Sequence, residues 1–157
     1  MATIHKSRGA QRELVAQFIA TYADSAYSTA STEAVPVLQA FNATSGTTYD
    51  VIGLPTNAII TGGWLSVDTA FNTTGTATLS IGDSSSATRY LGATTLKTAA
   101  VTSITPTGYV NTGALPIRIT LSLADTAATA GAFSLVIRYI TSGRVDEVER
   151  SFRNKTS

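Results

Sequence analysis

The chain has 157 residues and a formal net charge of +1, and Thr, Ala, Ser and Gly fill 78 of its positions. A chain of this length folds as one domain, with or without arms, and buries about two-thirds of its unfolded surface. The absence of cysteine excludes a disulfide scaffold, a zinc finger and a thiol nucleophile, and a single histidine excludes a multi-histidine metal site. The small net charge gives no global attraction to nucleic acid or to an acidic membrane, and no apolar run reaches the ~20 residues of a membrane span.

The charged residues are concentrated at the two ends of the chain. Residues 36–137 carry seven of the 21 charged side chains, and the other fourteen lie in the first 35 and the last 20 residues. We therefore expect an N-terminal arm over 1–34, a β-sandwich body over 35–140 and a charged tail over 141–157. No apolar signal-peptide core follows the basic N-terminal residues, so we expect the protein to stay in the compartment where it is made.

The N-terminal arm carries an apolar pattern of its own. Leu14, Phe18 and Ile19, with neighbouring apolar residues, lie on one helical stripe within residues 12–22. This spacing predicts a short amphipathic helix, and the alternative is an extended arm whose apolar residues dock on a partner. The Ser, Thr and Ala residues that dominate 22–33 predict a linker.

The body shows the two-residue period of β-strands. Strands are expected over 35–41, 49–54, 58–71 and 76–81. The third is long and contains Gly62-Gly63, a pair that favours a bulge or a bend rather than a straight strand.

The second half of the body contains the clearest alternation. Weaker strands are expected over 88–91 and 101–110, on either side of a helical or irregular segment over 93–100. Apolar residues then occupy every second position of 115–123, and again of 133–139, which predicts two half-buried strands. About eight strands with turn signals roughly every 8–12 residues predict an all-β fold, a single β-sandwich or jelly roll.

The sequence lacks the groups that a hydrolytic site requires. A general base, usually histidine, must lie within hydrogen-bond reach of the nucleophile. The only histidine is His5, so the Gly82-Asp83-Ser84 triplet, which resembles the opening motif of one esterase family, lacks that family's late histidine. The four acidic residues of the body are scattered. We therefore expect no enzymatic activity, no catalytic residue, no metal and no cofactor.

Two binding functions stay open on the residues alone. Trp64, Tyr90 and Tyr109 are candidates for a sugar-stacking platform of a carbohydrate-binding adhesin, although aromatic residues in strands more often pack in a core. The arms mix basic and acidic residues, which suits a protein partner better than a phosphate backbone. We expect no nucleic acid and no membrane as partner.

Six segments of the body carry a resemblance to a known family. They are Leu54-Pro-Thr-Asn-Ala-Ile-Ile-Thr-Gly-Gly-Trp-Leu-Ser-Val-Asp-Thr-Ala-Phe71, Thr76-Ala-Thr-Leu-Ser-Ile-Gly-Asp83, Arg89-Tyr-Leu-Gly92, Thr107-Gly-Tyr-Val110, Thr129-Ala-Gly131 and Leu135-Val-Ile-Arg-Tyr-Ile140. Together they resemble small virion proteins of tailed bacteriophages, of the capsid decoration or cement type. The resemblance covers roughly residues 49–140 and consists of strand signatures without a catalytic motif, so a β-module of a tail or fibre protein is the alternative.

The resemblance implies a non-enzymatic protein on the outer surface of the phage head, made in the host cytoplasm. It implies a homo-oligomer, with a trimer favoured and a dimer next, that bridges neighbouring major capsid proteins without touching DNA. The termini lie outside the matched segments, and we expect them to be the arms that bind neighbours. The contact residues expected there are Arg8, Arg12, Leu14, Phe18, Ile19, Arg144, Arg150, Phe152 and Arg153. On this view, removing residues 1–34 leaves the body folded and abolishes shell binding.

Overall fold

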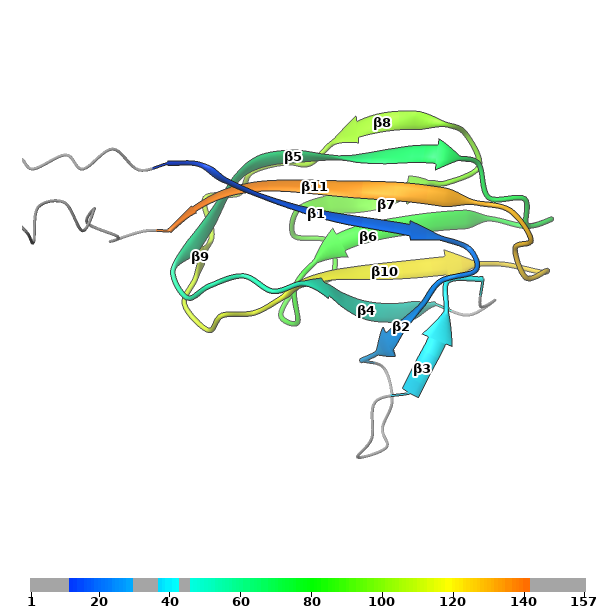
Figure 1. Cartoon of the computed structure of the whole chain (residues 1–157), viewed down its shortest axis with the longest axis horizontal. Helices are drawn as coiled ribbons and strands as arrows, with labels where there is room; N and C mark the ends of the chain where they lie inside the picture. The colour runs from blue at the N-terminus through cyan, green and yellow to red at the C-terminus, as the bar shows by residue number, and fades with distance from the viewer. Residues whose placement is uncertain (1–11, 30–36, 43–45, 142–157) are drawn as a thin grey trace, which may run out of the picture.

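The structure, a computed structural model, describes residues 12–29, 37–42 and 46–141. These residues form eleven strands in two antiparallel sheets that lie one over the other (Figure 1). Sheet A has the strand order β1-β11-β5-β8, with β9 also paired to β5, and sheet B has the order β3-β2-β4-β10-β6-β7. The predicted all-β sandwich is confirmed, and the jelly-roll assignment stays a prediction.

The two sheets differ in strand length. Sheet A consists of β1 (Leu14–Thr21), β5 (Ala58–Thr69), β8 (Ala100–Ser103), β9 (Val110–Asn111) and β11 (Ala132–Thr141). Sheet B consists of β2 (Ser25–Ser28), β3 (Val37–Ala40), β4 (Thr47–Ile52), β6 (Ala77–Gly82), β7 (Leu91–Thr95) and β10 (Ile117–Leu123). The two longest strands, β5 and β11, are neighbours and form the centre of sheet A. No helix in the part of the chain that the structure describes is long and apolar enough to cross a membrane.

The apolar side chains at every second position of the predicted strands form the core. In β10, every second side chain from Ile117 to Leu123 is at most 1% exposed, while Arg118, Thr120 and Ser122 between them lie on the outer face. Phe133, Leu135 and Ile137 of β11 face the same core from the opposite sheet, as predicted. Each sheet therefore buries one apolar face against the other, which is the main source of stability in a sandwich.

The predicted bulge in the long strand is present in β5. Arg138 pairs with Gly62 and Tyr139 pairs with Ile60, so Thr61 is an extra residue on the β5 side. Gly63 lies two residues after it and has φ of 146°, and a Cβ at Gly63 would overlap the backbone carbonyl oxygen of Val136 on β11. Only glycine satisfies both constraints.

The predicted helix over residues 12–22 is wrong, because Leu14–Thr21 forms β1. This strand pairs with β11 at eight consecutive positions. Ala16, Phe18 and Ala20 face the core, while Val15 and Ile19 face outward. The apolar spacing of this segment fits a helix and a strand equally well, and pairing with β11 satisfies the backbone groups while it buries Phe18.

Two further local predictions are corrected. The predicted linker over 22–33 contains β2, which pairs with β3 and β4. A turn leads into it, in which the backbone N–H and the hydroxyl of Thr21 donate to the Asp24 carboxylate at 2.7 and 2.9 Å and lower the pKa of Asp24. The segment over 93–100, predicted as helical or irregular, lies partly in β7. Because residues 12–29 belong to the sandwich, deleting residues 1–34 would remove β1 and β2.

Candidate functional site

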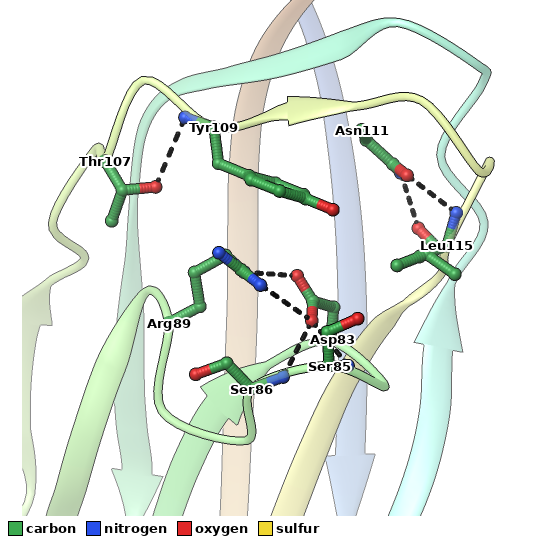
Figure 2. Close-up of polar contacts among 8 residues, drawn as sticks. All are labelled: Asp83, Ser85, Ser86, Arg89, Thr107, Tyr109, Asn111 and Leu115. Carbon is green, nitrogen blue, oxygen red and sulfur yellow. Dashed lines mark hydrogen bonds and ion pairs between the residues drawn. The ribbon is translucent and has the colours of Figure 1, made fainter.

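The Gly82-Asp83-Ser84 triplet begins at the last residue of β6 and continues into the loop that follows. The Asp83 carboxylate is 3% exposed and accepts hydrogen bonds from the backbone N–H groups of Ser85 and Ser86 at 2.8 and 2.9 Å. It also accepts a bond from Nε of Arg89 at 2.5 Å (Figure 2). These three hydrogen bonds tie the Asp83 carboxylate to its own loop.

Arg89 connects this loop to a second one. Its guanidinium carbon lies 3.8 Å from the centroid of the Tyr109 ring, and the hydrogen bond with Asp83 raises the pKa of Arg89 (Figure 2). Neighbouring Tyr90 is buried, and burial raises its pKa to about 12. The cluster contains stacked and paired groups and, within the described residues, no histidine that could activate Ser84. It stabilises two loops and lacks the parts of a hydrolytic site.

Asp83→Asn is expected to lower the free energy of unfolding by about 2 kcal/mol, because a charge-assisted hydrogen bond to Arg89 is lost. The matched control is Asp50→Asn. Its partner Arg118 donates at 2.7 and 3.1 Å on the surface of sheet B, and an exposed pair of this kind contributes less than about 1 kcal/mol. Urea unfolding followed by circular dichroism measures both, and equal losses would contradict a structural role specific to Asp83.

The three aromatic residues considered for a sugar platform do not share a surface. Trp64 on β5 is 39% exposed, whereas Tyr90 is 3% exposed. Arg89 covers one face of the Tyr109 ring. A stacking platform needs adjacent open rings, and the structure places one partly open ring in sheet A and buries another in the loop region. The carbohydrate-binding alternative therefore has no structural support.

The outer face of sheet A exposes several apolar side chains among polar ones. Val15 and Ile19 on β1 are 65% and 63% exposed, Trp64 on β5 is 39% exposed and Val101 on β8 is 68% exposed. Val136 on β11 lies between them, since it pairs with both Gln17 and Trp64, and it is only 7% exposed because its neighbours already cover it. We name the set Val15, Ile19, Trp64, Val101 and Val136 the apolar face.

Strand pairing places these residues in neighbouring rows of sheet A, with polar residues between some of them. One row across the sheet consists of Gln17, Val136, Trp64 and Ser103, and the next consists of Ile19, Ser134, Ser66 and Val101. Residues directly opposite on neighbouring strands have Cβ atoms about 5 Å apart. Trp64 and Val136 are the directly opposed apolar pair of these rows.

Charge on the same face is largely paired within the chain. The Glu13 carboxylate accepts from the hydroxyl of Thr61 and lies 3.5 Å from Nη1 of Arg138. The Arg138 guanidinium lies over Gly62, where a Cβ would meet it. This exposed pair adds little stability, but it leaves this part of the face nearly neutral.

The outer face of sheet B has the opposite character over β4, β10 and β6. It presents Thr48, Thr78, Thr120 and Ser122, with the Asp50–Arg118 ion pair. Side chains of this kind hydrogen-bond to water and need no partner. The outer face of sheet B is therefore polar over these three strands, whereas the outer face of sheet A exposes several apolar side chains.

The predicted contact residues lie in different environments in the structure. Arg12 is exposed, Leu14 is 37% exposed at the start of β1, and Ile19 belongs to the apolar face. Phe18 instead faces the core, with its ring centroid 6.0 Å from that of Phe41, so we no longer expect it to contact a partner. The remaining predicted residues lie outside the described residues: Arg8, Arg144, Arg150, Phe152 and Arg153.

Sequence reasoning missed Val15 and Val101 as surface residues. The predicted helix over 12–22 places Val15 on its apolar stripe, and the predicted weak strand over 101–110 gives no direction for Val101. The available signal was the apolar second face of the last long strand, where Val136 breaks the polar alternation. Within residues 12–29, 37–42 and 46–141, no group of three acidic, histidine or cysteine side chains could hold a metal ion.

Comparison with known proteins identifies solved structures with a similar fold. No protein-family model matches the chain, and no curated protein matches its sequence. A chain in the capsid asymmetric unit of cyanophage Pam1 shares 24% identity with a TM-score of 0.59, over 90% of this chain and 92% of that chain.

Two further solved structures are similar. A chain in the acidic stable capsid structure of Helicobacter pylori bacteriophage KHP30 shares 14% identity over 83% of this chain and 93% of its own, with a TM-score of 0.49. A chain in the capsid of Ralstonia phage GP4 shares 15% identity over 92% of each chain, with a TM-score of 0.49. At 24% identity the likeness to the Pam1 chain concerns the fold alone.

Proposed function

We propose that this chain is a non-enzymatic structural protein of a phage virion, a decoration (cement) protein on the outer surface of the head. The observation that carries the proposal is the fold shared with a chain of the Pam1 capsid over nine-tenths of both chains. The exposed apolar face of sheet A and the loop-holding role of the Asp83 cluster agree with a function in binding rather than in catalysis.

The protein acts as a homo-oligomer, a trimer or a dimer, that bridges neighbouring major capsid proteins. Each contact removes apolar surface from water, worth about 25 cal/mol per Å². An oligomer engages several capsid subunits at once, which raises its effective affinity by orders of magnitude without a new type of contact. Bridging of this kind stabilises the shell because the subunits can separate only if several contacts break together.

The first and last strands of the described chain are neighbours, so segments that extend from them could contact the same partner. Leu14 pairs with Tyr139, so the start of β1 and the end of β11 are neighbours at one end of sheet A (Figure 1). The described chain therefore starts and stops at the same end of sheet A. We propose that the charged segments 1–11 and 142–157 bind the shell, with Arg8, Arg12, Arg144, Arg150 and Arg153 pairing with carboxylates of the neighbours and Phe152 as an apolar contact.

Co-sedimentation with undecorated phage heads tests the function. The full chain is expected to pellet with the heads and to saturate at a fixed number of copies per major capsid protein. A variant lacking 1–11 and 142–157 keeps every described strand, so it should retain the circular dichroism spectrum of the full chain. It should bind at least about tenfold more weakly, because contacts worth about 1.4 kcal/mol or more are lost.

The deletion has to spare β1, because removing residues 1–34 takes away Phe18 and its packing on Phe41. Purified tails serve as the matched control for the alternative function. Binding to tails and not to heads would replace the head protein with a tail or fibre β-module. Undiminished binding of the shortened variant would show that the arms are not the contact.

A further inference from the structure

We infer that the free edge of β1 pairs with the same edge of a second copy of this chain, so that sheet A continues from one copy into the other. The inference rests on the proposed function, since it assigns a contact to the proposed homo-oligomer. It selects the dimer over the trimer, because a strand edge that pairs with itself around a two-fold axis closes on two copies.

The strand β1 forms the longest sheet edge in the part of the chain that the structure describes. Its eight residues pair with β11 without a register shift, and no described strand pairs with its other side. The edge strands β3, β7, β8 and β9 have only two to five residues, and the pairing of β7 is irregular. Proteins protect sheet edges with short strands, charged residues, proline or bulges. None of these is present in β1, which is typical of an edge that receives another strand.

The direction of the backbone groups of β1 follows from one hydrogen bond at its end. The N–H of Tyr22 donates to the carbonyl oxygen of Gly131, just before β11. Successive residues of a strand direct their N–H and C=O groups to opposite edges. The N–H and C=O groups of Val15, Gln17 and Ile19 therefore point away from β11, toward the free edge.

Thr21 points to the same edge, but its backbone groups are already bonded. Its N–H donates to the Asp24 carboxylate at 2.7 Å, and its carbonyl oxygen accepts from the N–H of Asp24 at 3.1 Å. The turn that contains Asp24 therefore closes the free edge at the end of β1. The backbone groups that remain for a partner strand belong to the three residues centred on Gln17.

These groups fix the register of a pair of β1 strands. Antiparallel pairing about Gln17 sets Val15 opposite Ile19 and Gln17 opposite its own copy, and each of these pairs exchanges two backbone hydrogen bonds. All the free groups of the three residues are then bonded. A register shifted by two residues sets Val15 opposite Thr21, whose groups Asp24 already occupies, or leaves Ile19 beyond the start of the other strand.

The core-facing side chains of β1 favour the same register. Phe18 lies in one row with Leu135 and Leu65, which are both 0% exposed, whereas Phe18 and Ala16 at the edge are only partly buried. Pairing about Gln17 sets Ala16 of one copy opposite Phe18 of the other. A small side chain then faces a large one, and both lose apolar surface to the second copy.

A second copy fits this edge better than an unrelated strand. The free backbone groups are arranged symmetrically about Gln17, which a strand that pairs with its own copy requires and an unrelated strand does not. None of the eight residues of β1 is charged, so two copies meet without repulsion between like charges. The first and last described residues lie at one end of sheet A, and pairing along β1 leaves that end open to the shell.

Disulfide trapping tests the register, because the natural chain has no cysteine. Residues opposite each other in a hydrogen-bonded pair have Cα atoms about 5.5 Å apart, which a disulfide spans. The full-length Gln17→Cys variant is therefore expected to form a cross-linked dimer under mild oxidation. Val15→Cys and Ile19→Cys should each fail to cross-link alone and should cross-link when mixed. Gln39→Cys on the edge strand β3 is the matched control and should not cross-link.

Sedimentation velocity of the purified full chain, without heads, measures the association. The wild type is expected to form a dimer. Gln17→Pro removes an N–H at the free edge and spares the pairing with β11, so it should raise the dissociation constant at least about tenfold. Circular dichroism checks that each variant folds, and if Gln17→Pro does not, the disulfide trapping decides.

A charge pair at the two-fold axis provides an independent test. Gln17→Lys and Gln17→Glu each set like charges opposite each other, so each variant alone should dissociate. An equimolar mixture of the two should associate to within about threefold of the wild type, because opposite charges then meet. Gln39→Lys is the matched control and should leave the dimer unchanged. Absence of the rescue in the mixture would overturn the register about Gln17.

The outcomes separate this inference from the proposed function. A monomeric or trimeric wild type would overturn the inference, and so would a dimer that a folded Gln17→Pro leaves intact. If the wild type is monomeric and Gln17→Pro weakens binding to heads, a strand of the shell pairs with β1, and the second copy is refuted as its partner. A cross-linked Gln17→Cys dimer whose wild-type form does not bind heads would retain the inference and refute the head function.

Discussion

Phe133→Ala is expected to lower the free energy of unfolding by about 4 kcal/mol, the usual cost of removing a fully buried phenylalanine. The ring is 0% exposed. Its centroid lies 6.0 Å from that of Phe41, 6.1 Å from that of Phe18 and 6.3 Å from that of Phe71. The ring therefore joins β11, β1 and the segments that flank β3 and β5, and its loss leaves a cavity that the surrounding strands cannot close.

Urea unfolding followed by circular dichroism measures the loss. Tyr27→Ala is the matched control, because it removes an aromatic ring that is 65% exposed, and a surface change of this kind costs about 0.5 kcal/mol or less. Similar losses in the two variants would show that the Phe133 cluster does not hold the sheets together.

Gly63→Ala is expected to destabilise the fold by about 3–5 kcal/mol, since it adds backbone strain to a steric overlap. The residue has φ of 146°, which a side chain disfavours. The added methyl group would overlap the carbonyl oxygen of Val136 and press on Ile104. Neither β5 nor β11 can move aside, because each is paired on both edges.

Gly53→Ala is the matched control for this substitution. A Cβ at Gly53 would meet no heavy atom within 4 Å, and replacing glycine at a permissive position is neutral or stabilises by up to about 1 kcal/mol. The thermal midpoints of the two variants should therefore shift by very different amounts. A Gly63→Ala variant as stable as Gly53→Ala would mean that the bulge accepts a side chain.

Strands with a strict two-residue period could be predicted from the sequence. In β10 and β11, apolar residues at every second position are sufficient, because a strand is the only regular structure that places all of them on one side. The bulge at Gly62-Gly63 could be predicted for a similar reason, because glycines inside a strand pattern usually mark a bulge or a bend. These features depend on neighbours within a few residues of one another in the chain.

The nature of β1 could not be predicted in the same way. Leu14, Phe18 and Ile19 are spaced as on a helix, and Ala16, Phe18 and Ala20 are spaced as on a strand. The choice depends on β11, whose pairing residues lie more than a hundred positions further along the chain. Tertiary contacts of this kind override local preference.

The apolar face is likewise a product of pairing. Val15, Trp64 and Val101 are each separated by more than thirty residues, and only the order β1-β11-β5-β8 brings them onto one surface. In the sequence each is one apolar residue among many, and single exposed apolar residues carry no meaning. Their significance arises from being neighbours.

The sequence by itself determined that this protein is a β-sandwich with a nearly neutral body, charged ends and no thiol or late histidine for catalysis. Composition and alternation are sufficient for these conclusions because both are local properties. Only the tertiary structure decided that Leu14–Thr21 is a strand, that Phe18 faces the core and that Val15, Ile19, Trp64 and Val101 are exposed on the outer face of sheet A. Which side of a strand is covered depends on the partner strand and on the opposite sheet, and the chain supplies both from distant positions.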